Sequence, residues 1–238
     1  MTIEQRLRNF QKEVHAVAKG RSIRIVAVSK THGPEVISEL LSCGHRDFGE
    51  NRQNEAREKF PLVQLSGISK EKLPVYHHIG PLQSGHARQI PGLFHWAHGV
   101  ASMSALDTLH KALIKYYDQN PDQKEPFHYL IQIDATNEST KLGGMSMEAF
   151  KNLNDIPQSQ VLHFAGFMTM GPENQDAVQT REVFHMLREL RDTINPSLEL
   201  SMGMSGDWKI ALEEGATILR PGSILFGSRN GGPWKPVS

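Results

Sequence analysis

Residues 23–31 read IRIVAVSKT, an apolar and largely β-branched run that ends abruptly at a lysine. A run of this length and composition is typical of a strand that is buried on both faces. A Gly-Pro pair follows at 33–34, and the pattern over 35–43 predicts a helix with proline in its first turn. Lys30 therefore stands at the carboxyl end of a core strand, where parallel α/β folds place their chemistry.

The position of Lys30 allows two interpretations. An amine that is partly desolvated at a strand end has a lowered pKa and is a nucleophile toward aldehydes. The alternative is a lysine whose amine simply extends into solvent. This segment alone favours the alternative, because most lysines lie at the surface. The decision depends on what the other strand ends carry.

The composition excludes several classes of protein. The chain has 238 residues, equal numbers of basic and acidic side chains (26 each) and a formal net charge of zero. With no block of like charge and no apolar run as long as a membrane span, we expect neither nucleic acid nor a membrane as a partner. Residues 1–6 lack the apolar core of a signal peptide. Cys43 is the only cysteine, which excludes an internal disulfide and predicts a cytoplasmic location.

Short apolar runs alternate with helical patterns from residue 23 onward. Candidate strands lie at 23–29, around 47–48, and at 75–79, 94–100, 127–133, 161–167, 198–202 and 217–220. Helical patterns lie at 34–43, 50–60, 84–90, 104–117, 146–153, 174–194 and 207–214. This alternation predicts one α/β domain over 1–238, a (β/α)8 TIM barrel with an extra N-terminal helix at 2–19. The competing fold is an open doubly wound sheet, but its glycine-rich turn after the first strand is missing.

In such a barrel, the residues that follow each strand face one common mouth. Besides Lys30, these are residues 48–51, His77 with 80–84, 201–207 and 220–223. Backbone amides at a helix start and serine hydroxyls form an anion site, and barrels usually bind phosphate at the loops after strands seven and eight. Alone, a loop rich in serine and glycine is most often a cap and a turn. An amine and a phosphate site together imply a phosphorylated aldehyde, and pyridoxal 5′-phosphate is the obvious one.

Five ordered motifs of this sequence resemble those of the pyridoxal-phosphate homeostasis proteins. They are AVSKT at 27–31, FGEN at 48–51, HHIGPLQS at 77–84, LSMGMS at 200–205 and RPGSILFG at 220–227. The resemblance implies a single-domain barrel similar to the N-terminal domain of alanine racemase. It also implies a Schiff base between Lys30 and the cofactor aldehyde, and a role in intracellular cofactor homeostasis.

The resemblance implies the rest of a cofactor site as well. The phosphate would contact the loop with Ser201, Met202 and Ser205, and the turn with Gly222 and Ser223. Arg220 would lie on the pyridine nitrogen, and Asn51 and His77 would line the pocket. We expect a monomer whose partners are the small-molecule cofactor and pyridoxal-phosphate-dependent apoenzymes.

The chain departs from the family pattern near the mouth. His32 replaces a lysine, His78 replaces an aromatic residue, Gly85-His86 replaces Asn-Lys, and Pro221 replaces isoleucine. Histidine in place of two cations would make cofactor exchange more dependent on pH. Lys141 matches a family lysine near the mouth and would attract the anionic cofactor; a solvated loop residue is the alternative.

The 12 histidines suggest a metal site, but their spacing argues against one. A catalytic metal needs about three converging ligands. His77 and His78 point to opposite faces of a strand, and so do His95 and His98. We therefore expect no metal.

Arg220 bears on whether the protein is a carrier or an enzyme. Electron-sink chemistry needs an acidic partner at the pyridine nitrogen, whereas arginine is a permanent cation that holds this nitrogen unprotonated. A racemase also needs a second acid or base opposite the lysine, and none of the four tyrosines falls in a mouth loop (Tyr76, Tyr116, Tyr117 and Tyr129). We expect a cofactor-binding protein without robust turnover. The alternatives are a small pyridoxal-phosphate-dependent racemase or lyase, and an interaction barrel that has lost the cofactor.

Overall fold

A computed structural model of the chain describes residues 1–123, 125–134, 144–146, 159–227, 232 and 234–236. Within this part, nine parallel strands form one sheet in the order β1-β9-β8-β7-β6-β5-β4-β3-β2. The strands are β1 (Arg24–Ile25), β2 (Ala27–Val28), β3 (Asp47–Glu50), β4 (Val75–Leu82), β5 (Trp96–Val100), β6 (Phe127–Gln132), β7 (Leu162–Met168), β8 (Glu199–Ser201) and β9 (Ile218–Leu219).

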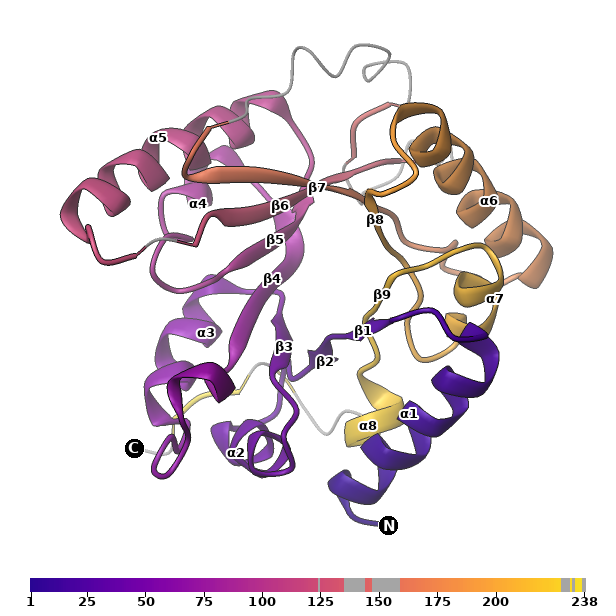
Figure 1. Cartoon of the computed structure of the whole chain (residues 1–238), viewed down its shortest axis with the longest axis horizontal. Helices are drawn as coiled ribbons and strands as arrows, with labels where there is room; N and C mark the ends of the chain where they lie inside the picture. Colours follow the sequence, from indigo (N-terminus) through magenta and orange to yellow (C-terminus); the bar gives the residue numbers. More distant parts are fainter. Residues whose placement is uncertain (124, 135–143, 147–158, 228–231, 233, 237–238) are drawn as a thin grey trace.

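The two edges of this sheet, β1 and β2, are consecutive pieces of one segment, so the sheet closes on itself (Figure 1). Val26, between the two strands, donates its backbone N–H to the Leu219 carbonyl at 2.8 Å. Ser29, just after β2, donates to the Gly49 carbonyl at 3.1 Å. The segment thus bridges β9 and β3, and the predicted barrel is confirmed, with the first predicted strand divided into two.

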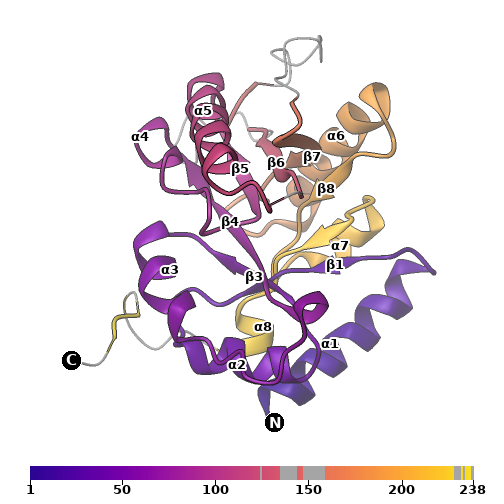
Figure 2. The same ribbon diagram turned by 60° about the vertical axis from the view of Figure 1, so that its left-hand side comes forward.

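Helices surround the barrel on its outside (Figures 1 and 2). They are α1 (Ile3–Ala18), α2 (Pro34–Ser42), α3 (Gln53–Lys59), α4 (Ser84–Ala87), α5 (Met103–Gln119), α6 (Ala177–Ile194), α7 (Trp208–Glu213) and α8 (Ser223–Phe226), with 3-10 turns at Phe60–Leu62 and Lys70–Lys72. The sequence does not predict α8 or the turn at 70–72, and the predicted helix at 146–153 lies almost entirely outside the described residues. No helix in the described part is long and apolar enough to cross a membrane.

The predicted N-terminal helix is confirmed as α1, which begins with a capping box between Thr2 and Gln5. Its buried face includes Phe10, which meets the Trp208 ring edge-on with 5.1 Å between centroids. Arg21, just beyond the helix, donates to the Ala216 carbonyl at 3.2 Å. The N-terminal segment therefore packs against α7 and hydrogen-bonds to the residues just before β9, next to the place where the barrel closes.

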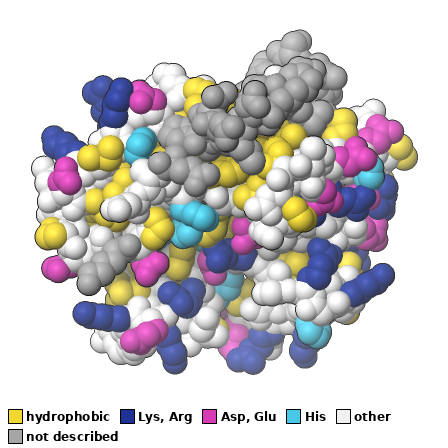
Figure 3. Space-filling model, turned by 45° about the horizontal axis from the view of Figure 1, so that its top comes forward, with side chains coloured by type: hydrophobic (Ala, Val, Ile, Leu, Met, Phe, Trp, Pro, Cys, Tyr) yellow, Lys and Arg dark blue, Asp and Glu magenta, His cyan; other side chains and the backbone are white. Residues whose placement is uncertain are grey.

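Two separate apolar cores hold the barrel. The larger one lies between the strands and the helices. The smaller one fills the interior of the barrel and consists of Val26, Trp96, Leu130, Ala165, Met168 and Ile218. On the face shown in Figure 3, basic and acidic side chains are interspersed, as expected for a chain whose formal net charge is zero.

Candidate functional site

A cavity of about 350 Å³ opens at the carboxyl end of the barrel strands. The structure brings six of the sequence-predicted site residues together in its lining: Lys30, Asn51, Ser205, Arg220, Gly222 and Ser223. Val28, Ile79, Pro81 and Met170 supply apolar walls. The cavity thus combines an amine, a guanidinium and hydroxyl groups around a space with apolar sides.

A buried charge cluster lies directly behind Lys30. Lys59 of α3 is fully buried, and its Nζ lies 2.7 Å from Glu50 Oε1 and 2.8 Å from Glu55 Oε1. Burial raises the pKa of Glu50 to about 7, although the Lys59 ammonium acts in the opposite direction. Two ionised carboxylates around one ammonium would leave a net negative charge in the interior, and a proton on Glu50 removes that charge.

This cluster holds the backbone on both sides of Lys30. The Lys59 Nζ donates to the Ser29 carbonyl at 3.0 Å, and the Thr31 N–H donates to Glu55 Oε1 at 2.7 Å. Thr31 has a φ of 70°, an uncommon conformation for a β-branched residue that persists only where its surroundings enforce it. The cluster therefore fixes the turn from which the Lys30 side chain projects into the cavity.

Arg220 is only 4% exposed, and burial lowers its pKa to about 10. At neutral pH it remains a cation. Its Nη1 donates to Ser201 Oγ at 2.6 Å and its Nη2 donates to the Thr169 carbonyl at 2.9 Å. A guanidinium has five N–H donors, so three of them have no acceptor among the described residues. Arg220 can therefore donate to a ligand in the cavity while its orientation stays fixed.

The loop after β8 presents Ser205 to the cavity. Its Oγ accepts the backbone N–H groups of Gly222 at 3.1 Å and Ile224 at 3.2 Å. These two donors occupy the oxygen and leave the hydroxyl proton for an acceptor on a ligand. The loop conformation requires glycine at 203, where φ is 92° and a Cβ would lie 2.6 Å from the Ala211 Cβ.

Three residues that the resemblance implies at the site do not line the cavity: His77, Ser201 and Met202. The predicted third strand ends at 79, but β4 continues to Leu82. His77 therefore lies deeper in the barrel, and Pro81 reaches the mouth in its place. Met202 is fully buried in the outer core between strands and helices.

Ser201 and His77 instead belong to a hydrogen-bonded chain through the interior of the barrel. From Arg220 Nη1 to Ser201 Oγ the distance is 2.6 Å, and from Ser201 Oγ to His98 Nδ1 it is 2.8 Å. From His98 Nε2 to His77 Nδ1 and from His77 Nε2 to Asp47 Oδ1 it is 3.0 Å each. Arginine can only donate and a carboxylate can only accept, so with both histidine rings neutral every group in this series donates toward Asp47.

This direction determines the state of the two histidines. Burial lowers the pKa of both His77 and His98, so each ring is neutral at pH 7. Each therefore carries its proton on Nε2 and accepts on Nδ1. Ser201, His98 and His77 inside the barrel thus have hydrogen-bond partners on both sides, between Arg220 at one end and Asp47 at the other.

The histidine in place of the family lysine after Lys30 also lies at the mouth. His32 lines the cavity, and its ring centroid is 5.0 Å from that of Phe226. Gln175 lines it too, although the helical pattern at 174–194 hides it, because α6 begins only at Ala177. Lys141 lies outside the described residues.

His77 and His78 point to opposite sides of β4, as the sequence predicts. His78 lies on the outer side, with its Nε2 3.0 Å from the Gln53 amide nitrogen. Within the described part of the chain, no group of three or more histidine, cysteine or acidic side chains is placed to hold a metal ion.

Comparison with known proteins identifies the family. The alanine racemase N-terminal domain profile matches residues 3–230. The pyridoxal phosphate homeostasis protein of Aquifex aeolicus is 35% identical to this chain and covers 94% of it, over 95% of its own length. The chain belongs to the pyridoxal phosphate homeostasis protein family. A second member of this family, from Pasteurella multocida, is 30% identical over 97% of the chain and 99% of its own length.

A solved structure supports the same assignment at the level of the fold. PipY of Synechococcus elongatus, with pyridoxal phosphate bound, matches with a TM-score of 0.75 and 29% identity. The match covers 95% of this chain and 100% of PipY. The resemblance drawn from the five motifs is thus confirmed for the family and for the barrel.

Proposed function

We propose that this chain binds pyridoxal 5′-phosphate in the cavity at the carboxyl end of the barrel and serves in the homeostasis of that cofactor. The relatives from Aquifex aeolicus and Pasteurella multocida carry that name, and PipY is known with the cofactor bound. The observation that carries the proposal is the convergence of Lys30, Arg220 and Ser205 on one cavity of about 350 Å³.

Each part of the cofactor has a matching group in the cavity. The Lys30 amine would attack the aldehyde carbon, form a C=N bond and release water. The Ser205 hydroxyl proton, with Ser223, would contact the phosphate, and a free N–H of Arg220 would face the pyridine nitrogen. Ile79 and Met170 would cover the ring. When bound, the cofactor supplies a carbonyl that can be captured and released reversibly.

We also propose that the site holds the cofactor without turnover of amino acids. Arg220 keeps its proton at neutral pH, since its pKa is about 10, and it would hold the pyridine nitrogen unprotonated. No carboxylate or tyrosine occurs among the described residues that line the cavity. Besides Lys30, His32 is the only group in this described lining that commonly serves as a general acid or base, and its ring packs against Phe226.

Borohydride trapping tests the binding site. The purified chain with added cofactor should show a visible absorption band that borohydride abolishes, and peptide mass spectrometry should find the pyridoxyl group on Lys30. Lys30→Arg keeps the charge but cannot form the C=N bond, so the adduct should disappear. The exposed Lys209, changed to arginine, is the matched control and should behave like the unchanged chain. An adduct mainly on another lysine would contradict the proposal.

Hydrogen exchange in heavy water tests the absence of turnover. Several L- and D-amino acids are incubated with the cofactor-loaded chain, and deuterium at the α-carbon and the chirality of the product are measured. We expect only slow exchange and no sustained racemisation. Racemisation at roughly 1 per second or faster would favour the alternative function, a small racemase.

A further inference from the structure

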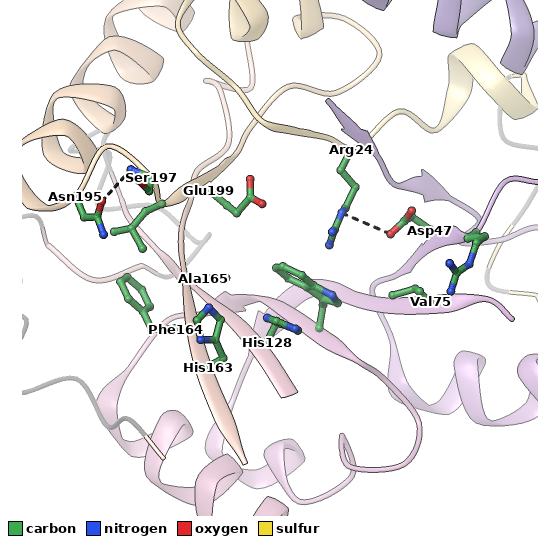
Figure 4. A pocket seen from close by; sticks show the side chains of 13 residues that line it. Arg24, Asp47, Val75, His128, His163, Phe164, Ala165, Asn195, Ser197 and Glu199 are labelled. Atoms are coloured by element: carbon green, nitrogen blue, oxygen red, sulfur yellow. Dashed lines mark hydrogen bonds and ion pairs between the residues drawn. The ribbon is translucent and has the colours of Figure 1, made fainter. Parts of the chain in front are cut away.

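A second cavity, of about 720 Å³, opens at the opposite, amino-terminal mouth of the barrel (Figure 4). It is lined by side chains from the beginnings of the strands, which point into the barrel. They include Arg24 of β1, Asp47 of β3, Trp96 of β5, His128 of β6 and Glu199 of β8. The proposed cofactor site uses none of these residues. The volume is within the range of roughly 300–1,000 Å³ that is usual for small-molecule sites.

One side of this cavity is built from stacked rings. Trp96 and His128 lie nearly parallel, at 13°, with 4.3 Å between centroids, and His163 meets His128 edge-on at 5.1 Å. Burial lowers the pKa of His128 to about 4, so this ring is uncharged at neutral pH. Phe164 and Leu198 add apolar surface nearby. This side of the cavity therefore suits an apolar group of a ligand.

Arg24 supplies an unused cationic edge above these rings. Its guanidinium carbon lies 4.6 Å from the centroid of the Trp96 ring, and its Nε lies 3.8 Å from Asp47 Oδ1. Asp47 already accepts the hydrogen bond from His77. The two Nη groups of Arg24 have no acceptor among the described residues. Such an edge binds a carboxylate through two parallel hydrogen bonds.

Glu199 supplies a carboxylate on the other wall. Alternation along β8 puts it on the same side as Ser201, the interior of the barrel. In Figure 4 its carboxylate points into the space between β8 and Arg24. Its carboxylate forms no hydrogen bond or ion pair with another described residue, Arg24 included. A guanidinium and a carboxylate thus face one cavity without neutralising each other.

We propose that this cavity is a second ligand site, which binds an α-amino acid with an apolar or aromatic side chain. The carboxylate of the ligand pairs with the Nη edge of Arg24, its ammonium group pairs with Glu199, and its side chain packs against the rings and Phe164. Opposite charges on the two walls favour a zwitterion over a ligand with a single charge, because a single charge leaves one wall unpaired. The inference does not rest on the proposed cofactor function.

Three ligands of similar shape test the charge requirement: L-phenylalanine, 3-phenylpropionate without the ammonium group, and phenethylamine without the carboxylate. Calorimetric titration uses chain freed of cofactor, because an amino acid could otherwise react with the cofactor at the other mouth. L-Phenylalanine should bind at least about fivefold more tightly than either analogue. Equal affinities for all three, or no binding of L-phenylalanine up to about 10 mM, would overturn the proposal.

Two variants assign the charges to residues. Arg24→Gln should remove the advantage of L-phenylalanine over phenethylamine, and Glu199→Gln should remove its advantage over 3-phenylpropionate. Arg57→Gln and Glu58→Gln, exposed on α3, are matched controls that should change neither ratio. Binding of L-phenylalanine that both cavity variants leave unchanged would rule the site out.

Tryptophan fluorescence tests at which mouth of the barrel L-phenylalanine binds. With Trp208→Phe and Trp234→Phe, the emission comes from Trp96 alone. L-Phenylalanine should shift or quench this emission at the concentrations at which it binds. The same titration on a Lys30→Arg chain should be unchanged. Loss of the response in that chain would place the ligand at the other mouth and contradict the proposal.

Discussion

At the scale of single residues, Ser201 and Ser205 show what sequence and structure each determine. The resemblance implies that both contact the phosphate, but Ser201 is the last residue of β8 and Ser205 lies in the loop that follows it. In the structure only Ser205 faces the cavity. Ser201 is fully buried and bridges Arg220 and His98. Two serines of one motif therefore have different roles.

The effect of each serine on ligand choice should differ accordingly. A hydroxyl that donates to a phosphate contributes on the order of 1.5–3 kcal/mol. Ser205→Ala should therefore weaken binding of pyridoxal 5′-phosphate at least about tenfold and change binding of pyridoxal, which has no phosphate, much less. Ser201→Ala should weaken both ligands by similar factors, since it removes a partner of Arg220. Equilibrium dialysis with both ligands gives the two ratios. A phosphate-selective loss in Ser201→Ala would contradict this division of roles.

At the scale of elements, β3 and α3 together position Lys30, although neither contains it. Glu50 ends β3, whereas Glu55 and Lys59 belong to α3. The three charges meet in the interior and hold the turn after β2. A helix that the sequence predicts only as the helical pattern at 50–60 thus supports the candidate site.

Glu50 should make the stability of this support depend on pH. Burial raises the pKa of Glu50 in the folded state from its ordinary value of 4.5 to about 7, so the folded chain binds this proton more tightly than the unfolded chain does. The stabilisation of the fold by protonated Glu50 is complete below pH 4.5 and is lost as the pH rises through about 7. Raising the pH from about 5 to about 8 should therefore lower the free energy of unfolding by on the order of 1–3 kcal/mol through the loss of this proton.

Glu50→Gln cannot titrate, so this fall in stability should disappear in the variant. Urea unfolding at the two pH values gives the comparison, and Glu58→Gln, exposed on the same helix, serves as the control. An unchanged pH dependence in Glu50→Gln would show that the proton is held elsewhere in the cluster.

The limits of sequence-based prediction are also clearest at the scale of elements. Alternating apolar runs and helical patterns predict the strand order and the N-terminal helix. They do not predict that β4 continues to Leu82, because Gly80 and Pro81 are ordinarily turn residues. Those extra residues determine the depth of every side chain on β4, and for that reason His77 lies inside the barrel and not at its mouth.

At the scale of the whole molecule, the barrel brings together residues that no local pattern connects. The mouth was predictable, because the carboxyl ends of parallel strands always meet at one edge. The hydrogen-bonded series from Arg220 to Asp47 was not predictable, because it depends on which side chains of different strands lie at the same depth in the barrel. His98 and Ser201, which hydrogen-bond at 2.8 Å, are 103 positions apart in the sequence.

The hydrogen-bonded series from Arg220 to Asp47 should contribute to the stability of the whole barrel. His98→Leu removes the central member and leaves His77 Nδ1 and the Ser201 hydroxyl proton buried without partners. Each such group costs about 1–3 kcal/mol, so the variant should lose roughly 2–5 kcal/mol of unfolding free energy. His15→Leu, on the exposed side of α1, is the control and should change stability little. If His98→Leu lost no more unfolding free energy than this control, the hydrogen-bonded series through the barrel would not contribute to stability as proposed.

The donor-to-acceptor direction of these hydrogen bonds gives a second, independent observable, the protonation state of His77 and His98. Nitrogen NMR of the unchanged protein should show His77 and His98 neutral and protonated on Nε2 at pH 7. Because burial lowers the pKa of both rings, their neutral state favours folding above pH 6.5, and this contribution is lost as the pH falls below it. Acid should therefore destabilise the unchanged protein more steeply than His98→Leu. Finding the proton on Nδ1 of either neutral ring would contradict this hydrogen-bond direction.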